Sequence, residues 1–271
     1  VLSNHGKLLC VIMKMLKGKR VIVTGASSGI GEQMAYHLAR MGSHILITAR
    51  TEVKLQKVST QCRELGAASI HYVSGSMENM SPQSCLLGGL DMLILNHVGS
   101  THFGYFKGDI EHPRKLLEIN VLSYVAMTVS ALPMLKESRG SVVAVSSLAG
   151  KVGNPFTVPY STTKFALDGF FSSLRQMLIV ENANVSITLC VLGYINTGKA
   201  AMKAVSHVIC NKPAPKEECA LEIIKSGALR QRELHYPYIS VTIPLILRDW
   251  VPDFLDALTR NIMDIEKVER T

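Results

Sequence analysis

The chain lacks the features that mark several classes of protein. It has no run of 18 apolar residues, so it contains no complete membrane span. No run of five Lys or Arg residues occurs, so we expect no surface dedicated to nucleic acid. The six cysteines form no Cys-x-x-Cys pair and no histidines have zinc-site spacing, so neither a disulfide framework nor a metal site is expected.

The length of 271 residues fits one large domain or two small ones, and one is favoured because doubly wound α/β sheets often reach about 250 residues as a single core. A hydrophobic content of 47% with 18% charged residues excludes a disordered chain, a collagen and a coiled coil. The formal net charge of +8 suits an anionic small ligand or an anionic membrane surface. We expect a main domain over residues 18–238. Before it, residues 1–17 fit either a remnant signal-anchor or an ordinary N-terminal segment. After it, the apolar segment 239–271 is expected to contact a membrane or a second subunit.

Strand-like and helix-like patterns alternate from residue 19 onward. Apolar runs predict strands at 20–24, 44–48, 70–73, 91–96, 141–146 and 185–192. Helical patterns cover 31–41, 52–65, 114–136 and 160–180, with further helices near 217–225 and after Pro252. Near-continuous apolar strands separated by amphipathic helices indicate a parallel sheet covered on both faces. The predicted fold is therefore a single-domain, doubly wound α/β sheet of the Rossmann type.

A glycine-rich loop lies between the first predicted strand and the first predicted helix. Residues 24–31 read Thr-Gly-Ala-Ser-Ser-Gly-Ile-Gly. Glycines permit a tight turn and let the backbone approach a pyrophosphate, which the helix N-terminus then stabilises. The alternative is a turn that only packs the helix against the strand. We expect dinucleotide contacts from Gly25, Ala26, Ser27, Ser28, Gly29, Ile30 and Gly31.

The end of the second predicted strand indicates which dinucleotide binds. An acidic residue there would accept the ribose hydroxyls, but the chain has Thr48-Ala49-Arg50-Thr51. A guanidinium forms charge-assisted, often bidentate contacts with phosphate, so Arg50 favours NADP(H). The alternative is that Arg50 is only a solvated surface residue.

Four polar residues complete a specific pattern. Tyr160 and Lys164 are four residues apart on one helical face. Ser147 follows a predicted strand, and Asn120 lies within a predicted long helix. Together with the glycine loop, this pattern resembles the short-chain dehydrogenase/reductase family, from Gly18 to about Leu229. Within that family, the stretches around these residues are most similar to the hydroxysteroid dehydrogenases.

The resemblance implies a mechanism that the side chains also suggest. An ammonium next to a phenol favours phenolate, so Lys164 is expected to lower the pKa of Tyr160 and make it a competent acid and base. Ser147 would hold the substrate oxygen, Lys164 would also bind the nicotinamide ribose, and Asn120 would hold a water in the proton path. Other residues implied to contact the cofactor are Thr51, Ser76, Met77, Asn96, His97, Val98, Ile195, Asn196 and Thr197. Substrate contacts are expected from Ser147, Tyr160 and Asn154.

The chain departs from its family at several positions. Asn96-His97-Val98-Gly99 stands where the family usually has Asn-Asn-Ala-Gly. The connection from Met77 to Asp91 is about seven residues shorter than in the hydroxysteroid members and is near the minimum for a parallel crossover. Gly198-Lys199 replaces an acidic stretch, which puts substrate affinity in doubt. Ser28 replaces a lysine, which leaves Arg50 as the main phosphate ligand.

The resemblance also implies a cellular setting and a substrate class. It implies a homodimer on the luminal side of the endoplasmic reticulum membrane, with no nucleic-acid partner. Two glycosylation sequons occur, at Asn79 and Asn184, and Pro82 makes the first a poorer acceptor. The expected reaction interconverts a lipophilic 11-ketosteroid and its 11β-hydroxysteroid with NADP(H). The alternatives are a carbonyl reductase, a retinol-type dehydrogenase and a catalytically silent relative.

Overall fold

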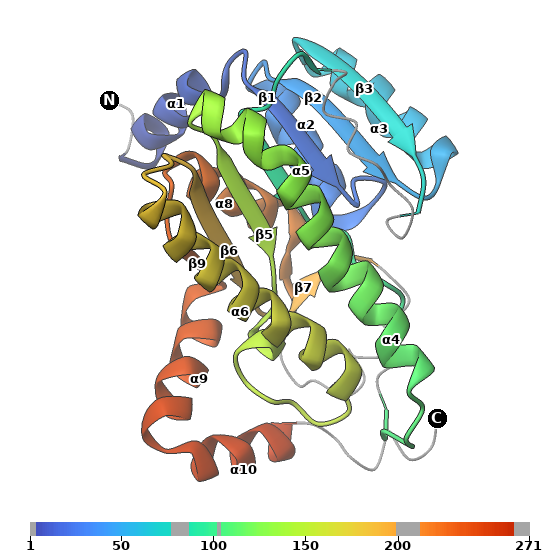
Figure 1. Cartoon of the computed structure of the whole chain (residues 1–271), viewed down its shortest axis with the longest axis vertical. Helices are drawn as coiled ribbons and strands as arrows, with labels where there is room; N and C mark the ends of the chain where they lie inside the picture. The colour runs from blue at the N-terminus through green and yellow to red at the C-terminus, as the bar shows by residue number, and fades with distance from the viewer. Residues whose placement is uncertain (1–3, 77–86, 102–103, 199–211, 263–271) are drawn as a thin grey trace.

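The computed structural model describes residues 4–76, 87–101, 104–198 and 212–262. Its centre is a parallel sheet of seven strands in the order β3-β2-β1-β4-β5-β6-β9 (Figure 1). This confirms the predicted doubly wound α/β fold. The strands are β1 Arg20–Thr24, β2 His44–Ala49, β3 Ser69–Ser74, β4 Met92–Leu95, β5 Ser141–Val145, β6 Ser186–Leu192 and β9 Glu233–Tyr236. A separate pair joins β7 Ile195–Asn196 to β8 Ala214–Pro215.

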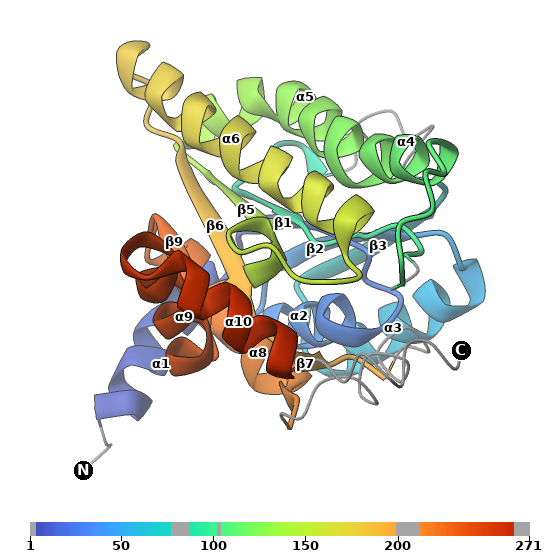
Figure 2. The ribbon, with the colours of Figure 1, turned by 90° about the horizontal axis from the view of Figure 1, so that it is seen from below.

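Helices cover both faces of the sheet, as the view from below shows (Figure 2). Alternate residues of a strand point to opposite faces: Val21 and Val23 join one core, and Ile22 joins the other. The first core includes side chains of α1 Asn4–Leu16, α2 Gly29–Arg40, α3 Glu52–Glu64 and α8 Lys216–Ala228. The second includes side chains of α5 Ser123–Ser138, α6 Val158–Val180 and α9 Tyr238–Trp250. A short π-helix, η2 Glu118–Leu122, joins α4 Glu111–Leu117 to α5.

The predicted strands and main helices agree with the structure to within a few residues. Several elements were not predicted: the short pair β7 and β8, the helix α9 within the predicted apolar segment, and two that add to the sheet or its core. One is β9, which adds a seventh strand at the edge of the sheet beside β6. The other is α1, whose Ile12 and Leu16 are buried in the first core. Most of the shortened connection from Met77 to Asp91 lies outside the described residues.

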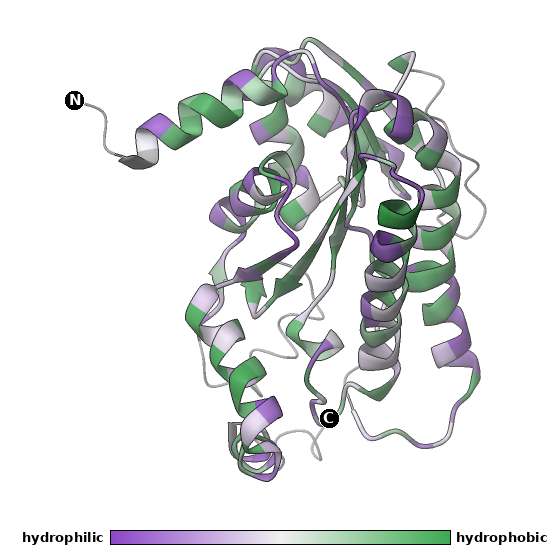
Figure 3. Ribbon diagram, turned by 60° about the vertical axis from the view of Figure 1, so that its left-hand side comes forward, coloured by the Kyte–Doolittle hydropathy of each residue, from purple (hydrophilic) through white to green (hydrophobic). Residues whose placement is uncertain are grey.

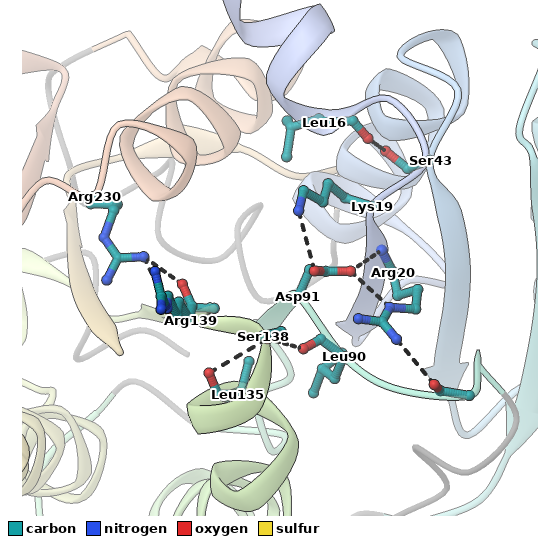
Figure 4. A network of polar contacts seen from close by, with 12 residues as sticks. Leu16, Lys19, Arg20, Ser43, Leu90, Asp91, Leu135, Ser138, Arg139 and Arg230 are labelled. Carbon is teal, nitrogen blue, oxygen red and sulfur yellow. Dashed lines mark hydrogen bonds and ion pairs between the residues drawn. The ribbon is translucent and has the colours of Figure 1, made fainter. Parts of the chain in front are cut away.

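Charged side chains fix the edge of the sheet where the strands begin (Figure 4). Asp91 contacts the Lys19 ammonium at 3.4 Å and the Arg20 Nε at 2.8 Å. The Arg20 backbone amide also donates to Asp91, at 3.0 Å. Burial opposes the Asp91 charge, but its bonds with Arg20 outweigh this effect and lower its pKa. This network joins β1 to β4 at their amino ends. The carboxyl ends of the strands, on the opposite side, are left for ligands.

One helix, Glu111–Ser138, is long and apolar enough to cross a membrane by length and composition. It spans α4, η2 and α5, and it covers one face of the sheet with Tyr124 and Leu135 fully buried. A core helix of a soluble protein can have the same length and composition, so this finding does not distinguish a membrane-spanning helix from a core helix.

The C-terminal helices α9 and α10 Pro252–Ile262 lie at the lower end of the molecule (Figures 1 and 3). Val241 of α9 is fully buried in the second core, so this segment packs in part on its own domain. The exposed side of α9 carries several large apolar side chains, whereas that of α10 carries one among charged residues such as Asp253 and Asp256. Large exposed side chains of the two helices are Tyr238, Ile239, Ile243, Ile246, Trp250 and Phe254.

Candidate active site

The glycine loop joins β1 to α2 at the carboxyl edge of the sheet. Gly25 and Gly29 have φ angles of +65° and +64°, which favour glycine. Gly31 lies so close to the Gly25 carbonyl and the Asn96 side chain that a Cβ atom would collide with both. The Asn96 amide donates to the Thr24 carbonyl at 3.0 Å and so holds the loop against β4. The loop thus presents its backbone at close range, as dinucleotide binding requires.

Two further observations fit a dinucleotide at this loop. Ser28 occupies the N-cap of α2 without a side-chain capping bond, so it does not use the helix amides that would bind phosphate. The Thr197 hydroxyl is buried and has no hydrogen-bond partner among the described residues. Thr197 lies beside Gly29, whose added Cβ atom would come within 3.4 Å of it. An unpartnered buried hydroxyl next to the glycine loop is suited to a polar group of a bound ligand.

The other predicted cofactor residues follow the ends of neighbouring strands. Arg50 and Thr51 are exposed after β2, and Ser76 follows β3. Asn96, His97 and Val98 follow β4 in that order, while Ile195 and Asn196 form β7. Ala26, Ser27 and Ile30 belong to the glycine loop and the start of α2. Met77 and Lys199 lie outside the described residues.

Three of the four predicted catalytic residues meet at the end of β5. Ser147 follows β5, and its hydroxyl accepts from the Ala149 amide at 3.2 Å at the start of η3 Leu148–Gly150. Tyr160, in the first turn of α6, is hydrogen-bonded to Ser147. The Lys164 ammonium lies 5.7 Å from the centre of the Tyr160 ring. A phenol, a hydroxyl and an ammonium therefore share one site, the set that carbonyl reduction needs.

The expected decrease in the Tyr160 pKa is not found in the structure. Burial raises the pKa of the phenol, and the hydrogen bond with Ser147 only partly opposes this. Lys164 is itself buried and donates to the Val145 carbonyl at 2.9 Å. Tyr160 and Lys164 lie on one helical face, as their spacing of four residues predicted. The loss of hydration on burial nevertheless has the larger effect on the pKa of the phenol. The phenol therefore holds its proton at neutral pH.

Asn120 has a different setting from the one predicted. It lies in the π-helix η2 rather than in a regular helix. Its carbonyl oxygen accepts from the Gly99 amide at 2.7 Å, and its amide nitrogen donates to the Thr163 hydroxyl at 3.2 Å. The Thr163 hydroxyl in turn donates to the Tyr160 carbonyl at 2.8 Å. The Asn120 side chain thus connects the strand-end loop with the helix that carries Tyr160. The role expected for Asn120, holding a water in the proton path, stays a prediction.

Sequence reasoning missed the aromatic support beneath Lys164. The Tyr124 ring is fully buried, with the Lys164 ammonium 5.8 Å from its centre. The Tyr124 hydroxyl donates to the His97 carbonyl at 2.8 Å, and the two rings lie 4.5 Å apart. The spacing of Tyr124 four residues after Asn120 was the available signal, since it places both on one helical face.

The predicted substrate residue Asn154 lies in the loop between η3 and α6. Its amide donates to the Val152 carbonyl at 3.3 Å. In the same loop, Phe156 has a φ of 64° and packs edge-on against Tyr105, with ring centres 5.1 Å apart. The Gly104 amide donates to the Phe156 carbonyl at 3.1 Å. Two segments far apart in sequence thus meet through aromatic rings in the loop that precedes Tyr160, a contact that no periodicity signals.

An ion cluster anchors the loop that follows Ser147. The Lys151 ammonium lies 2.7 Å from Asp168 of α6 and 2.9 Å from Glu233 of β9. Burial works against the Lys151 charge, but these two carboxylates outweigh it and raise its pKa. The Arg248 guanidinium of α9 donates to the Lys151 carbonyl at 2.9 Å. The loop that follows Ser147 is therefore tied to α6, β9 and α9 at once.

Known proteins resemble this chain over most of its length. A protein named hydroxysteroid 11-beta-dehydrogenase 1-like protein A from Xenopus laevis is 45% identical over 94% of this chain and 90% of its own length. A protein named hydroxysteroid 11-beta-dehydrogenase 1-like protein from Danio rerio is 47% identical over 91% of this chain and 88% of its own length. A protein of the same name from Gallus gallus is 50% identical over 83% of this chain and 80% of its own length.

Solved structures share the fold at lower identity. One described as a short chain dehydrogenase/reductase family protein matches with a TM-score of 0.70 at 22% identity, over 82% of this chain and 96% of the other. A second, from Sinorhizobium meliloti 1021, gives the same TM-score and identity over 83% and 98%. The model of the short chain dehydrogenase family matches residues 19–206, which include the glycine loop, Ser147, Tyr160 and Lys164. The chain belongs to the short-chain dehydrogenase/reductase family.

Proposed function

We propose that this oxidoreductase interconverts an 11-ketosteroid and the corresponding 11β-hydroxysteroid with NADP(H). The observation that carries the proposal is the hydrogen-bonded pair of Ser147 and Tyr160 beside Lys164, at the same edge of the sheet as the glycine loop. The steroid class is supported by relatives at 45% to 50% identity that are named hydroxysteroid 11-beta-dehydrogenase 1-like proteins.

Each of the three side chains has one task in this reaction. Ser147 holds the substrate oxygen by a hydrogen bond, and Tyr160 gives that oxygen a proton during reduction. Burial raises the pKa of Tyr160, so the phenol carries the proton that ketone reduction consumes. The Lys164 ammonium favours the phenolate left behind and would bind the nicotinamide ribose. The nicotinamide, when bound, supplies or accepts the hydride.

The choice of NADP(H) rests on the end of β2. Arg50 is the first residue after Ala49, its side chain is exposed, and no acidic side chain precedes α3 there. A guanidinium at this point attracts a 2′-phosphate, whereas an acid would repel it. Ser28 adds no charge, so Arg50 is the main ligand that we assign to the phosphate.

A second candidate is a carbonyl reductase or retinol-type dehydrogenase with another lipophilic substrate. The observation that favours it is the aromatic contact of Tyr105 with Phe156 in the loop before Tyr160. Such rings would bind any flat or extended apolar ketone. The two candidates differ in substrate and share the same chemistry at Tyr160.

A turnover assay separates the candidates. Purified protein is given NADPH or NADH with a panel of 11-ketosteroids, retinals and xenobiotic ketones, and loss of reduced cofactor is followed. The proposal expects the highest kcat/KM for an 11-ketosteroid with NADPH. A retinal or xenobiotic ketone as the best substrate would establish the second candidate. Binding of NADPH without turnover of any ketone would indicate a catalytically silent relative.

We further propose that the protein works as a homodimer at the luminal surface of the endoplasmic reticulum membrane. The exposed apolar face of α9 supports the lipid contact, because it would place a lipophilic substrate near its source. Glycosylation at Asn184 is consistent with its exposure and with Arg230, which bonds the amide oxygen at 2.7 Å rather than the nitrogen. Protein from a secretory host should lose mass with a peptide N-glycosidase, and the variant Asn184→Gln should not.

A further inference from the structure

The His97 side chain lies at the centre of a buried polar network. Its exposed fraction is 6%, and it points away from the surface into contact with three elements. The Nδ1 atom is 2.8 Å from the Thr24 hydroxyl at the end of β1. The Nε2 atom is 2.6 Å from the Ser123 hydroxyl at the start of α5 and 3.1 Å from the Ile119 carbonyl in η2.

The contacts of the network identify the position of the ring proton. The Ser123 hydroxyl lies 2.6 Å from the Ile119 carbonyl, which can only accept, so Ser123 donates its one proton there. Ser123 must then accept from Nε2–H of His97. The Thr24 hydroxyl already accepts from the Asn96 amide at 2.8 Å, and it lies closer to Nδ1, at 2.8 Å, than to the Ile94 carbonyl, at 3.3 Å, so we assign Nδ1 as the acceptor of its proton. Burial and the nearby Lys164 ammonium lower the pKa of His97 to about 3, so the ring stays neutral with this single proton.

The same network stabilises the irregular turn of the helix. The Ser123 amide donates to the Glu118 carbonyl, five residues back, instead of to the Ile119 carbonyl. The Ile119 carbonyl is served by the Ser123 hydroxyl and by His97 Nε2–H. The residue that follows Ile119 is Asn120, whose two side-chain bonds connect Gly99 with Thr163.

We infer that His97 is a positioning residue for the reaction: its Nε2–H holds the π-turn that presents Asn120, and its ring supports Tyr124 beneath Lys164. The inference rests on the proposed chemistry at Tyr160 and assigns His97 no contact with substrate. It also gives a reason for a histidine in Asn96-His97-Val98-Gly99. A ring reaches from β4 to both β1 and η2, which the shorter side chain of asparagine cannot do.

Two substitutions distinguish the bond made by Nε2 of His97 from the bond made by Nδ1. In His97→Gln, the amide nitrogen can replace Nε2–H and retain the bond to η2. In His97→Asn, the amide oxygen can replace Nδ1 and retain the bond to Thr24, while the bond to η2 is lost. We expect kcat to fall about threefold in His97→Gln and at least about thirtyfold in His97→Asn, the latter corresponding to about 2 kcal/mol. The KM of the ketone substrate should change by less than about twofold in both.

Two measurements without substrate complete the test, so they remain decisive if the parent turns over no ketone. Hydrogen exchange of amides 115–126 should be faster in His97→Asn than in His97→Gln. The ¹⁵N spectrum of histidine-labelled parent protein, assigned by the signal lost in His97→Gln, should show a neutral Nε2–H ring from pH 5 to 8. Equal effects of the two substitutions, or an Nδ1–H ring, would overturn the inference. If His97→Asn does not fold, the parent spectrum still tests the inference, because an Nδ1–H ring would overturn it.

Discussion

At the scale of single residues, removal of one oxygen atom from Tyr160 should separate proton transfer from cofactor binding. Tyr160→Phe is expected to reduce kcat at least about a thousandfold, because the phenol supplies the proton. NADPH affinity should stay within about twofold, since we assign its binding to the glycine loop, Arg50 and Lys164. Stopped-flow turnover and NADPH fluorescence measure the two quantities. Activity within tenfold of the parent would remove Tyr160 from its role as acid and base.

The cofactor preference should depend on Arg50 alone. Arg50→Asp replaces a phosphate ligand with a group that accepts ribose hydroxyls, so affinity for NADPH should fall by about 1.5–3 kcal/mol while affinity for NADH rises. Arg63→Asp, on an exposed site of α3, makes the same change in charge away from the site. If both variants, or both cofactors, respond equally, Arg50 does not recognise the 2′-phosphate.

The residues of the site were predictable where a motif fixed both their type and their place. The glycines and Ser147 follow predicted strands, Tyr160 and Lys164 share a helical face, and the resemblance to the family implied their roles. The pKa of Tyr160 was not predictable, because it depends on burial by residues from other elements. The contacts of the His97 side chain were likewise not predictable, since the sequence does not show that this side chain faces inward.

At the scale of elements, the contacts of β9 predict a pH-dependent contribution to stability. Burial opposes the charge of Glu233, but its bonds with the Lys151 ammonium and with His235 outweigh burial and lower its pKa. A lowered carboxyl pKa stabilises the fold above the unfolded pKa, and this contribution is lost as pH falls through the folded value. Glu233→Gln should therefore lower the free energy of unfolding by about 1–3 kcal/mol at pH 7, and by less near pH 3.

The matched control for this substitution is Glu181→Gln. Glu181 pairs with Lys136 at 2.6 Å, but both side chains are more than 40% exposed. Exposed pairs contribute about 0–1 kcal/mol, so the change should be small at either pH. Urea denaturation of the three proteins measures the difference. A loss in Glu233→Gln that is the same at pH 3 and pH 7 would mean that charge is not its cause.

The strand β9 itself shows what periodicity cannot predict. Residues 233–236 read Glu-Leu-His-Tyr, a run too short and too polar to be distinguished from a loop. The strand forms because β6 offers an open edge, on which it pairs in parallel from Leu189 to Leu192. Tertiary pairing, rather than local preference, places this strand.

At the scale of the whole molecule, the exposed apolar face of α9 should bind lipid. Ile243→Glu combined with Trp250→Glu puts two charges on that face and leaves the buried Val241 in place. We expect the fraction that floats with anionic liposomes to fall at least about fivefold, because apolar area and basic charge drive such binding. Met177→Glu on α6, which is 55% exposed, is the control. Unchanged flotation with a halved sedimentation mass would instead identify the face as a contact between two copies.

The bond from Arg248 to the Lys151 carbonyl has a thermodynamic consequence. It makes the position of α9 and the conformation of the loop after Ser147 two parts of one equilibrium. Linkage is reciprocal: a ligand that favours the docked position of α9 also favours the ordered loop, and occupancy at the loop favours docking by the same factor. A surface that holds α9 would therefore tighten substrate binding without touching the substrate, and a bound substrate would raise the affinity of the protein for that surface by the same factor.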